Sequence, residues 1–374
     1  MRTAGTFFIA GGGTGGHLYP GLAIADALVA ECPDLNIHFI GAQRGIERTV
    51  LPDTRWPHTL LDLHPLYRSA PWSNWKTVRG LASAFGRIGN LARAQAPLGA
   101  LGTGGYAAGA LLGYARFNRI PYFLQEQNAV AGLTVKFFSA HARASFVGFP
   151  EAISTLPAAA RNRALVTGNP IVPPPEPRPD RAVARKAWSF SNDIARVLLV
   201  FGGSQGSRAI NDAFAAWLAT GLPPGWGVIW VTGRGEFERL KSHASANVRV
   251  VAYQQPMAEA YAAADLAIAR AGAMSTAELC AWSIPMILIP LPTAAGDHQT
   301  QNADALARAK AALLIVQSTL ATDGLSLAIS MVTASERLLA EMAAAAGSRA
   351  RIDAAQVIAR HIIASLNLQS FRVN

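Results

Sequence analysis

The residues of this chain that could do chemistry begin with a histidine directly behind a glycine-rich loop. In FFIAGGGTGGHLYPG, residues 7–21, His17 follows five glycines and one threonine. A neutral imidazole can take a proton from an attacking hydroxyl near physiological pH. Glycine N–H groups and the N-terminus of a following helix can bind an anion. The segment therefore predicts a proton acceptor beside a phosphate-binding loop, with helix capping as the alternative role for His17.

Further polar segments follow other apolar stretches. ARVLLVFGGSQGSRAIND (195–212) repeats the order of apolar stretch and glycine loop, and RAGAMSTAELCAW (270–282) leads into a helix that carries Glu278. Its carboxylate is placed to accept ribose hydroxyls while loop amides hold a diphosphate, or simply to stabilise the start of a helix. Polar side chains also follow two further apolar segments, in DHQTQNA (297–303) and QEQNAVAGLT (125–134). These side chains either bind the ligand or are simply exposed to solvent.

The first loop also fits the fingerprint of dinucleotide-binding proteins, because Gly11, Gly13 and Gly16 satisfy G-x-G-x-x-G. Such a site needs an acidic residue at the end of the second strand for the ribose 2′-hydroxyl. Here GAQRG (41–45) stands at that place, and Arg44 could at most accept a 2′-phosphate. A dehydrogenase also gives the second glycine loop no role. Two loops favour a sugar nucleotide instead.

Short apolar segments alternate with helical patterns along the whole chain. They lie at 7–10, 36–40, 98–102 and 120–125, and again at 195–201, 228–233, 248–253, 266–272 and 286–290. Strands that alternate with helices form parallel, doubly wound sheets, which bind ligands at the carboxyl ends of their strands. We therefore expect an α/β protein whose two Rossmann-like domains face each other across a cleft that holds the site.

A proline-rich segment separates the two halves. NPIVPPPEPRPD, residues 169–180, holds six prolines, which cannot occupy a helix interior or a central strand. We therefore expect an N-terminal domain, a linker, a C-terminal domain and a terminal helical segment, over residues 1–170, 171–180, 181–348 and 349–374.

The composition suits a globular enzyme with an anionic partner. The 374 residues carry a formal net charge of +10, and no acid occurs between Asp62 and Glu126, where seven Lys and Arg residues lie. A basic stretch of this kind favours nucleic acid, a phosphorylated substrate or an acidic lipid surface. Two cysteines without metal spacing fit a reducing compartment. The uncharged segment 94–115 holds six glycines and a proline, so we expect no membrane span.

One stretch mixes aromatic and basic residues. In WSNWKTVRGLASAFGRIGNLAR (72–93) apolar residues recur at helical spacing and cations interleave with them. Such a helix either packs its apolar face on the domain core or lies on anionic lipid with its tryptophans at headgroup depth. The second alternative predicts a membrane face formed by Trp72, Trp75, Lys76, Arg79 and Phe85.

In their order and spacing these segments resemble the MurG family of bacterial transferases, glycosyltransferase family 28. The resemblance runs through GGGTGGHLYPGLAIADAL, TGGY, EQN-x-x-AGLT, TGNP, GGSQGSRAIN, RAGAMSTAEL and DHQTQNA, and so covers most of the chain. It implies the GT-B fold, with the acceptor and membrane face on the first domain and the UDP-GlcNAc site mainly on the second. It also implies a C-terminal helix, around 350–366, that crosses back onto the first domain.

The same resemblance implies roles for single residues. His17 would be the catalytic base, and Tyr106 and Glu126 would lie on the acceptor side. The implied donor contacts are Thr14, Gly15, Gly16, Asn128, Ser204, Gln254 (through its backbone, to uracil), Ala273, Met274, Ser275, Thr276, Ala277, Glu278 and Gln299. Three positions depart from the family pattern: Gln125 replaces a usual His, Val135 a usual Asn, and Val172 a usual Arg. The last removes one cation from the donor side, and the other two point to a shifted acceptor preference.

The reaction implied is inverting transfer of GlcNAc from UDP-GlcNAc to the C4 hydroxyl of undecaprenyl-diphospho-MurNAc-pentapeptide, a step of peptidoglycan synthesis. The chain lacks an Asp-x-Asp pair, so we expect no metal and no other cofactor. The expected partners are the two substrates and anionic inner-leaflet lipid at the cytoplasmic face of the plasma membrane. No nucleic acid is expected, because a nucleic-acid-binding protein would leave both glycine loops unexplained. A UDP-GlcNAc epimerase of the same fold, which needs no lipid acceptor, is the alternative.

Overall fold

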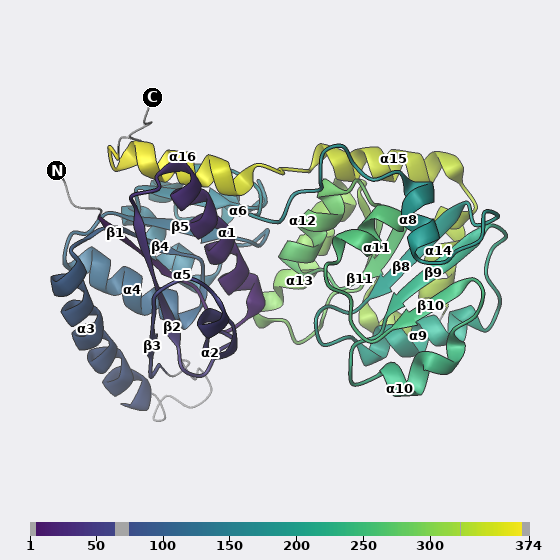
Figure 1. The fold of residues 1–374 in the computed structure, drawn as a ribbon, viewed down its shortest axis with the longest axis horizontal. Coiled ribbons are helices and arrows are strands. Elements are labelled where there is room, and N and C mark those ends of the chain that lie inside the picture. The colour runs from purple at the N-terminus through teal and green to yellow at the C-terminus, as the bar shows by residue number, and fades with distance from the viewer. Residues whose placement is uncertain (1–4, 64–74, 322, 369–374) are drawn as a thin grey trace. The chain divides into compact units, whose positions relative to one another are not determined.

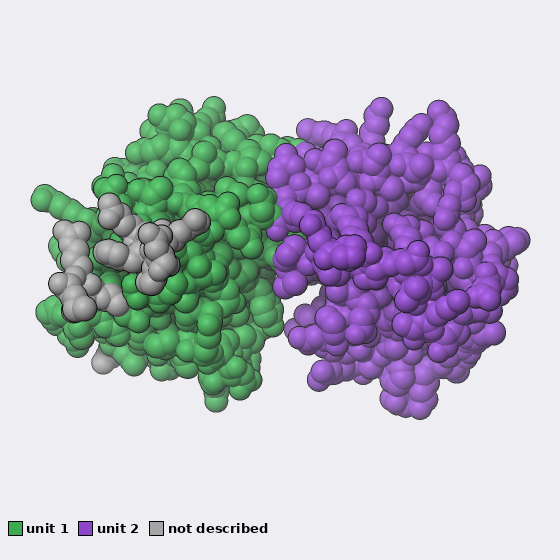
Figure 2. Space-filling model, turned by 45° about the horizontal axis from the view of Figure 1, so that its top comes forward, with its two compact units in different colours: residues 1–171, 353–374 green, residues 172–352 purple. Residues whose placement is uncertain are grey.

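The computed structural model describes residues 5–63, 75–321 and 323–368. The chain forms two compact units, which Figure 2 colours separately: unit 1 comprises Met1–Ile171 and Asp353–Asn374, and unit 2 comprises Val172–Ile352. Each unit is built on one parallel sheet flanked by helices (Figure 1). The expected pair of Rossmann-like α/β domains is therefore confirmed.

Unit 1 contains a seven-stranded sheet in the order β3-β2-β1-β4-β5-β6-β7. Its strands are β1 (Thr6–Ala10), β2 (Asn36–Ala42), β3 (His58–Leu61), β4 (Pro97–Gly102), β5 (Tyr122–Glu126), β6 (Ala144–Val147) and β7 (Ala164–Val166). Its helices are α1 (Gly15–Glu31), α2 (Glu47–Val50), α3 (Trp75–Gln95), α4 (Gly105–Phe117), α5 (Leu133–Phe138), α6 (Ala152–Thr155), α7 (Ala158–Arg161) and α16 (Ala354–Ser365), with 3₁₀ turns η1 (Leu51–Asp53) and η3 (Ser139–His141).

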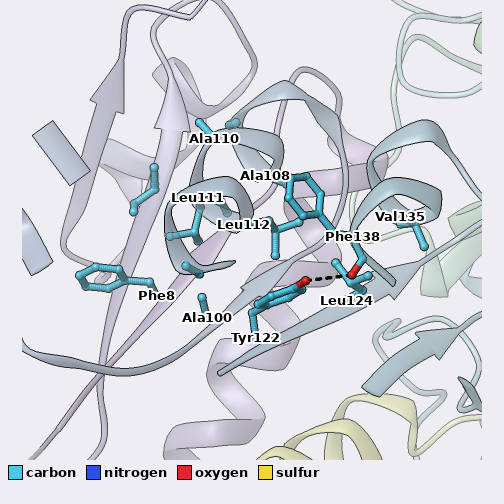
Figure 3. Close-up of a cluster of buried hydrophobic side chains, with 14 of the residues drawn as sticks. Phe8, Ala100, Ala108, Ala110, Leu111, Leu112, Tyr122, Leu124, Val135 and Phe138 are labelled. Carbon is cyan, nitrogen blue, oxygen red and sulfur yellow. Dashed lines mark hydrogen bonds between the residues drawn. The ribbon is translucent and has the colours of Figure 1, made fainter. Parts of the chain in front are cut away.

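The strand β1 shows why this sheet is covered on both faces. All five of its residues are buried, and side chains that alternate along a strand point to opposite faces. Phe8 joins the core under α4 and α5, where the Tyr122 hydroxyl donates a hydrogen bond of 2.9 Å to the carbonyl of Phe138 (Figure 3). Phe7 joins the opposite core, which holds Ile358 of α16. The helix α16 packs beside α1, so the end of the chain completes unit 1 (Figure 1).

Unit 2 contains a six-stranded sheet in the order β10-β9-β8-β11-β12-β13. Its strands are β8 (Arg196–Phe201), β9 (Trp226–Val231), β10 (Val248–Val251), β11 (Leu266–Ala269), β12 (Met286–Leu288) and β13 (Ala312–Leu314). Its helices are α8 (Arg181–Ala187), α9 (Arg208–Leu218), α10 (Phe237–Leu240), α11 (Ala258–Ala263), α12 (Ala273–Ala281), α13 (His298–Arg308), α14 (Gly324–Thr333) and α15 (Glu336–Ser348), with 3₁₀ turns η4 (Lys241–His243), η5 (Ala295–Asp297) and η6 (Gln317–Ala321).

From Val172 onward, the proline-rich segment belongs to unit 2. Arg178 donates a hydrogen bond of 2.7 Å to the carbonyl of Ala281, at the end of α12. Asp180 then caps α8, because its carboxylate accepts hydrogen bonds from the backbone N–H groups of Ala182 and Val183. These contacts fix residues 172–180 on unit 2.

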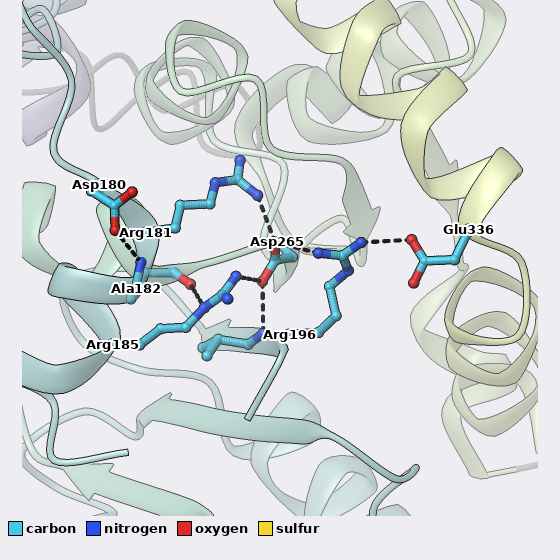
Figure 4. Close-up of polar contacts among 9 residues, drawn as sticks. Asp180, Arg181, Ala182, Arg185, Arg196, Asp265 and Glu336 are labelled. Atoms are coloured by element: carbon cyan, nitrogen blue, oxygen red, sulfur yellow. Dashed lines mark hydrogen bonds and ion pairs between the residues drawn. The ribbon is translucent and has the colours of Figure 1, made fainter. Parts of the chain in front are cut away.

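A buried carboxylate joins α8 to the sheet of unit 2. Asp265 precedes β11 and is 3% exposed, and its oxygens lie 2.5 Å from Arg181 and 2.7 Å from Arg185 (Figure 4). It also accepts a hydrogen bond of 2.8 Å from the N–H of Val197 in β8. A buried charge must be paired in this way to be tolerated. The cluster lies where β8 and β11 begin, at the opposite end of these strands from their glycine loops.

Candidate functional site

In unit 1 the glycine loop after β1 meets the loops that follow β4 and β5. These three strands are neighbours in the parallel sheet, so their carboxyl ends lie at one edge. The β1 loop leads into α1, whose first turn carries His17. Thr103 and Gly104 follow β4, and residues 127–132 follow β5. The order reverses between β1 and β4, which is where such sheets bind ligands.

The imidazole of His17 is oriented by the loop that precedes it. Its Nδ1 lies 3.1 Å from the carbonyl oxygen of Gly12 and 3.4 Å from Oγ1 of Thr14. A carbonyl oxygen only accepts, so Nδ1 carries the proton in the neutral ring and Nε2 holds the lone pair. Thr14 and Gly16 are exposed, and Gly15 is half-buried. The expected proton acceptor is thus held in the tautomer that a base at Nε2 requires.

Two residues of the TGGY segment support His17, and the sequence-based prediction assigned neither of them this role. Gly104 has φ of +111°, and a Cβ built on it would lie 2.6 Å from Cδ2 and 2.9 Å from Nε2 of His17. Only glycine fits there, because both the backbone angle and the space exclude a side chain. The buried Thr103 donates a hydrogen bond of 2.6 Å to the backbone carbonyl of His17.

A third residue absent from the prediction, Glu47, contacts the glycine loop from α2. Glu47 begins α2 and is 0% exposed. Its carboxylate accepts hydrogen bonds from the N–H groups of Gly13 at 2.9 Å and Ala42 at 3.1 Å. A Cβ on Gly12 would lie 1.6 Å from Glu47 Oε1. Glu47, the first acidic residue after β2, therefore binds the glycine loop itself. A dinucleotide pyrophosphate bound at this loop would be repelled by the negative charge of Glu47.

The two residues predicted on the acceptor side have different surroundings. The Tyr106 ring lies close to Gly13, since a Cβ built on that glycine would be 3.5 Å from Tyr106 Cε1. Burial raises the pKa of its phenol, and the charge of Glu47 raises it further. Glu126 is buried, and its carboxylate accepts hydrogen bonds from the N–H groups of Asn128 at 3.0 Å and Gly132 at 2.7 Å. The Asn128 side chain donates to the same carboxylate through Nδ2. The carboxylate of Glu126 therefore holds the loop that follows β5.

The two departures in this region are buried. Gln125 is 0% exposed and donates a hydrogen bond of 3.1 Å to Asn169 Oδ1, while its own Oε1 accepts one from Gln127. Gln127 Nε2 also lies 2.6 Å from the carbonyl oxygen of Thr103. A buried amide network thus stands behind the loop that holds His17. Val135 is buried in the hydrophobic core beside α4, and its aliphatic side chain cannot form a hydrogen bond.

In unit 2 the second glycine loop borders a pocket of about 520 Å³. Among the predicted donor residues, Ser204, Ser275 and Gln299 line it. The loop runs from β8 into α9, whose N-cap Ser207 also lines the pocket. Ala273 and Met274 belong to the first turn of α12, and the N-terminus of a helix favours a bound anion. Gln299 is anchored because its Oε1 accepts a hydrogen bond of 2.9 Å from the N–H of Leu291.

The same pocket is lined by Arg270, a cation that the sequence did not lead us to expect there. Arg270 follows β11 and lines the pocket. Its guanidinium donates to Ser207 Oγ at 2.8 Å, to Gln317 Oε1 at 2.7 Å and to the carbonyls of Ile289 and Pro290. Burial lowers its pKa, although an arginine side chain stays protonated. These acceptors are neutral, so none of them cancels the positive charge of Arg270 at the wall of the pocket, which Arg208 also lines.

Glu278 lies one turn beyond Ser275 on α12, hence on the same side of that helix. The Tyr261 hydroxyl donates a hydrogen bond of 2.7 Å to its Oε2, and burial raises the pKa of the carboxyl. Thr276 is buried and bonds the carbonyls of Gly272 and Ala273, so its side chain serves the helix. Ala277 is half-buried on the same helix.

Gln254 does not line this pocket. Its Nε2 donates to the carbonyl of Pro256 at 3.1 Å and to Glu259 Oε2 at 2.8 Å, and it borders a separate pocket of about 440 Å³ with Trp188 and Trp282. Its side chain therefore lies at a different pocket from the one beside the glycine loop, and the predicted contact of its backbone with uracil stays a prediction. Val172, at the position of the usual Arg, is 81% exposed.

The predicted membrane face is described only in part. Trp72 lies outside the described residues, and only the helical backbone is described for Trp75, Lys76 and Arg79. Phe85 is half-buried against α4, with its ring centroid 6.0 Å from that of Tyr114. Phe85 therefore packs on the domain core, as the alternative for this helix predicts. On α5, which packs against α4, Leu133 and Phe137 are 65% and 68% exposed.

In the described part of the chain, no three His, Cys, Asp or Glu side chains come together as a metal site. Within the same residues, no helix is both long and apolar enough to cross a bilayer.

Both units of the chain match domains of one known protein family. Residues 7–147 match the glycosyltransferase family 28 N-terminal domain, and residues 197–358 match its C-terminal domain. Both glycine loops and both predicted sets of polar residues lie within the matched parts.

Relatives match over nearly the whole length. A protein of Salinibacter ruber, named UDP-N-acetylglucosamine--N-acetylmuramyl-(pentapeptide) pyrophosphoryl-undecaprenol N-acetylglucosamine transferase, is 40% identical over 95% of each chain. A protein of the same name from Chlorobium luteolum is 38% identical over 95% of this chain and 97% of its own. The crystal structure of Acinetobacter baumannii MurG superposes with a TM-score of 0.77 at 29% identity, covering 96% of this chain and 99% of that one. The two-sheet architecture is thus the GT-B fold.

Proposed function

This chain belongs to glycosyltransferase family 28, and we propose that it transfers GlcNAc from UDP-GlcNAc to the C4 hydroxyl of undecaprenyl-diphospho-MurNAc-pentapeptide. The whole-length identity of 40% to a relative named for this transfer carries the proposal. The pocket of unit 2 and the oriented His17 of unit 1 supply the groups that the reaction needs. The names of the relatives favour this transfer over the epimerase reaction, and peptidoglycan synthesis is the process it serves.

The diphosphate of the donor binds in the pocket of unit 2. Amides of the Gly202–Ser207 loop and the N-terminus of α9 provide donors for phosphate oxygens, and Arg270 provides charge. Glu278, held by Tyr261, accepts the ribose hydroxyls, and Gln299 contacts the sugar. Val172 takes the place of one family cation, so Arg270 carries more of the charge balance in this chain.

The transfer is a single displacement with inversion. The C4 hydroxyl oxygen forms a bond to the anomeric carbon, its proton passes to Nε2 of His17, and the bond from that carbon to the β-phosphate oxygen breaks with its electron pair. The departing UDP is stabilised by the loop amides, the helix N-terminus and Arg270. Tyr106 lies beside the loop that holds His17 and contacts the acceptor. Protein groups alone carry this charge, without a metal ion.

The proposal is tested by following labelled GlcNAc from UDP-GlcNAc to a short-chain muramyl-pentapeptide lipid acceptor, with and without EDTA. We expect transfer at equal rates in both, since the pocket supplies the positive groups itself. A rate that collapses in EDTA and returns with added magnesium would refute the metal-independent reaction. Conversion of UDP-GlcNAc to an epimer without acceptor would replace transfer with the epimerase reaction.

The acceptor is a lipid, so unit 1 works at the cytoplasmic face of the plasma membrane as a peripheral protein. The basic helix α3 and the exposed pair Leu133 and Phe137 of α5 support this placement. We expect vesicle binding to rise with the fraction of anionic lipid and to fall with added salt, as measured by co-sedimentation. Phe137→Ser should weaken it, whereas Val183→Ser, an equally exposed position of unit 2, should not. Equal binding by both variants would exclude α5 from the contact.

A further inference from the structure

The contacts of Glu47 and of His17 meet on one peptide group. The N–H of Gly13 donates to Glu47 Oε2 at 2.9 Å, and the carbonyl of Gly12 accepts from Nδ1 of His17 at 3.1 Å. That N–H and that carbonyl belong to the single planar unit between Gly12 and Gly13. The carboxylate and the imidazole are therefore bonded to opposite ends of one peptide dipole.

Such an arrangement polarises the peptide. A carboxylate that accepts from the N–H increases the negative charge on the carbonyl oxygen, and hydrogen bonds in a chain strengthen one another in this way. The carbonyl then holds the Nδ1 proton more firmly and stabilises the imidazolium that forms when Nε2 takes a proton. In known active sites a carboxylate bonded directly to Nδ1–H does the same.

The packing around Glu47 keeps this arrangement in place. The carboxylate is fully buried, and its second N–H partner, that of Ala42, fixes it to the end of β2. A Cβ on Gly45 would lie 1.9 Å from Glu47 Oε2, so the approach on that side also requires glycine. On the other side, Gly104 fits against the ring of His17. We call the chain from the Glu47 carboxylate through the Gly12–Gly13 peptide to the His17 imidazole the relay. Gly45 packs against its carboxylate end and Gly104 against its imidazole end.

We propose that Glu47 is a positioning residue for the transfer, which sets the tautomer and basicity of His17 through the Gly12–Gly13 peptide. This inference rests on the proposed function, and it assigns to the first glycine loop a task other than binding a substrate phosphate. The charged and titratable side chains nearest to His17 and Glu47 along these elements include Tyr19, Arg44, Arg48, Tyr106 and Glu126; Asp26 and Glu31 lie further along α1, and Tyr114 and Arg116 lie further along α4.

The test compares Glu47→Gln with Asp53→Asn, which removes the same charge from an exposed position six residues further along. We expect Glu47→Gln to lower kcat by about 10–100-fold, as for other supporting carboxylates, with an unchanged KM for UDP-GlcNAc. Without the carboxylate the imidazolium is less stable, so the rise of kcat/KM with pH should move to lower pH. Asp53→Asn should keep the wild-type profile. Glu47→Asp, which keeps the charge, should lie closer to wild type than Glu47→Gln.

A measurement on the unmodified protein covers the case in which Glu47→Gln fails to fold. Long-range ¹⁵N–¹H spectra report which ring nitrogen of His17 carries the proton, and the relay requires Nδ1–H in the neutral ring. A neutral ring protonated at Nε2 would overturn the proposal. So would a folded Glu47→Gln protein with the pH profile of wild type. If the wild-type protein transfers no GlcNAc while the Nδ1–H tautomer is observed, the proposed function fails and the geometry of the relay stands.

Discussion

Replacing His17 with alanine is expected to lower kcat by about 10²–10⁴-fold, the usual contribution of a general base. The hydroxyl proton then has no acceptor at the position that Nε2 occupies, while the Gly12 carbonyl loses the bond that held Nδ1. The affinity for UDP-GlcNAc should change little, because Ser204, Arg270 and Gln299 line the donor pocket in unit 2. Steady-state transfer rates and UDP binding by calorimetry measure the two effects separately.

His141→Ala is the matched control, because His141 is exposed on unit 1 and stands apart from the glycine loops. It should transfer at the wild-type rate. A His17→Ala protein that keeps wild-type kcat would remove His17 from the chemistry. A loss of UDP affinity equal to the loss of kcat would place His17 in donor binding instead.

Replacing Arg270 with alanine is expected to lower kcat by about 10²–10³-fold, the usual effect of removing one donor that stabilises developing negative charge. Charge collects on the β-phosphate as the glycosidic bond breaks, and Arg270 lines that pocket with its guanidinium held by four neutral oxygens, whereas Arg208, which also lines it, is paired with Asp212. The affinity for UDP should fall too, because the diphosphate of UDP carries the negative charge that Arg270 stabilises. Arg270→Lys should recover part of both, since an ammonium keeps the charge but not the planar fork.

Arg308→Ala serves as the control in the same unit, because Arg308 is exposed and pairs with Asp304 on the surface of α13. Thermal unfolding of each variant separates lost activity from lost folding, which matters for a side chain that joins β12 to η6 through Gln317. A folded Arg270→Ala protein with wild-type kcat would show that the loop amides alone stabilise the leaving group.

The fold was largely predictable because its central strands are continuous apolar runs. FFIA and VLLVF are buried on both faces, as expected of strands in a parallel sheet that helices cover. The strands that were not predicted, β3, β6, β7 and β13, have three or four residues each. A segment that short carries little periodicity of its own, but β10, β11 and β12 are equally short and were predicted, so strand length alone does not separate the two groups.

The site was predictable only where chemistry and chain position coincide. His17 follows its loop directly, and Ser204 and Ser275 follow theirs, so sequence order alone brings them to a strand end. Phe85 shows the limit of this reasoning. Its spacing fitted a lipid-facing or a core-facing helix equally, and the ring of Tyr114 on α4 decides for the core.

The sequence by itself determined the two sheets, the two glycine loops and the residues that stand next to them, because these depend on neighbours along the chain. The tertiary structure alone decided which distant groups complete each loop. Glu47 reaches Gly13 across 34 residues, and Arg270 reaches Ser207 across 63. Such contacts depend on which strands become neighbours and on the space that glycines leave between them, and no local pattern in the chain encodes that.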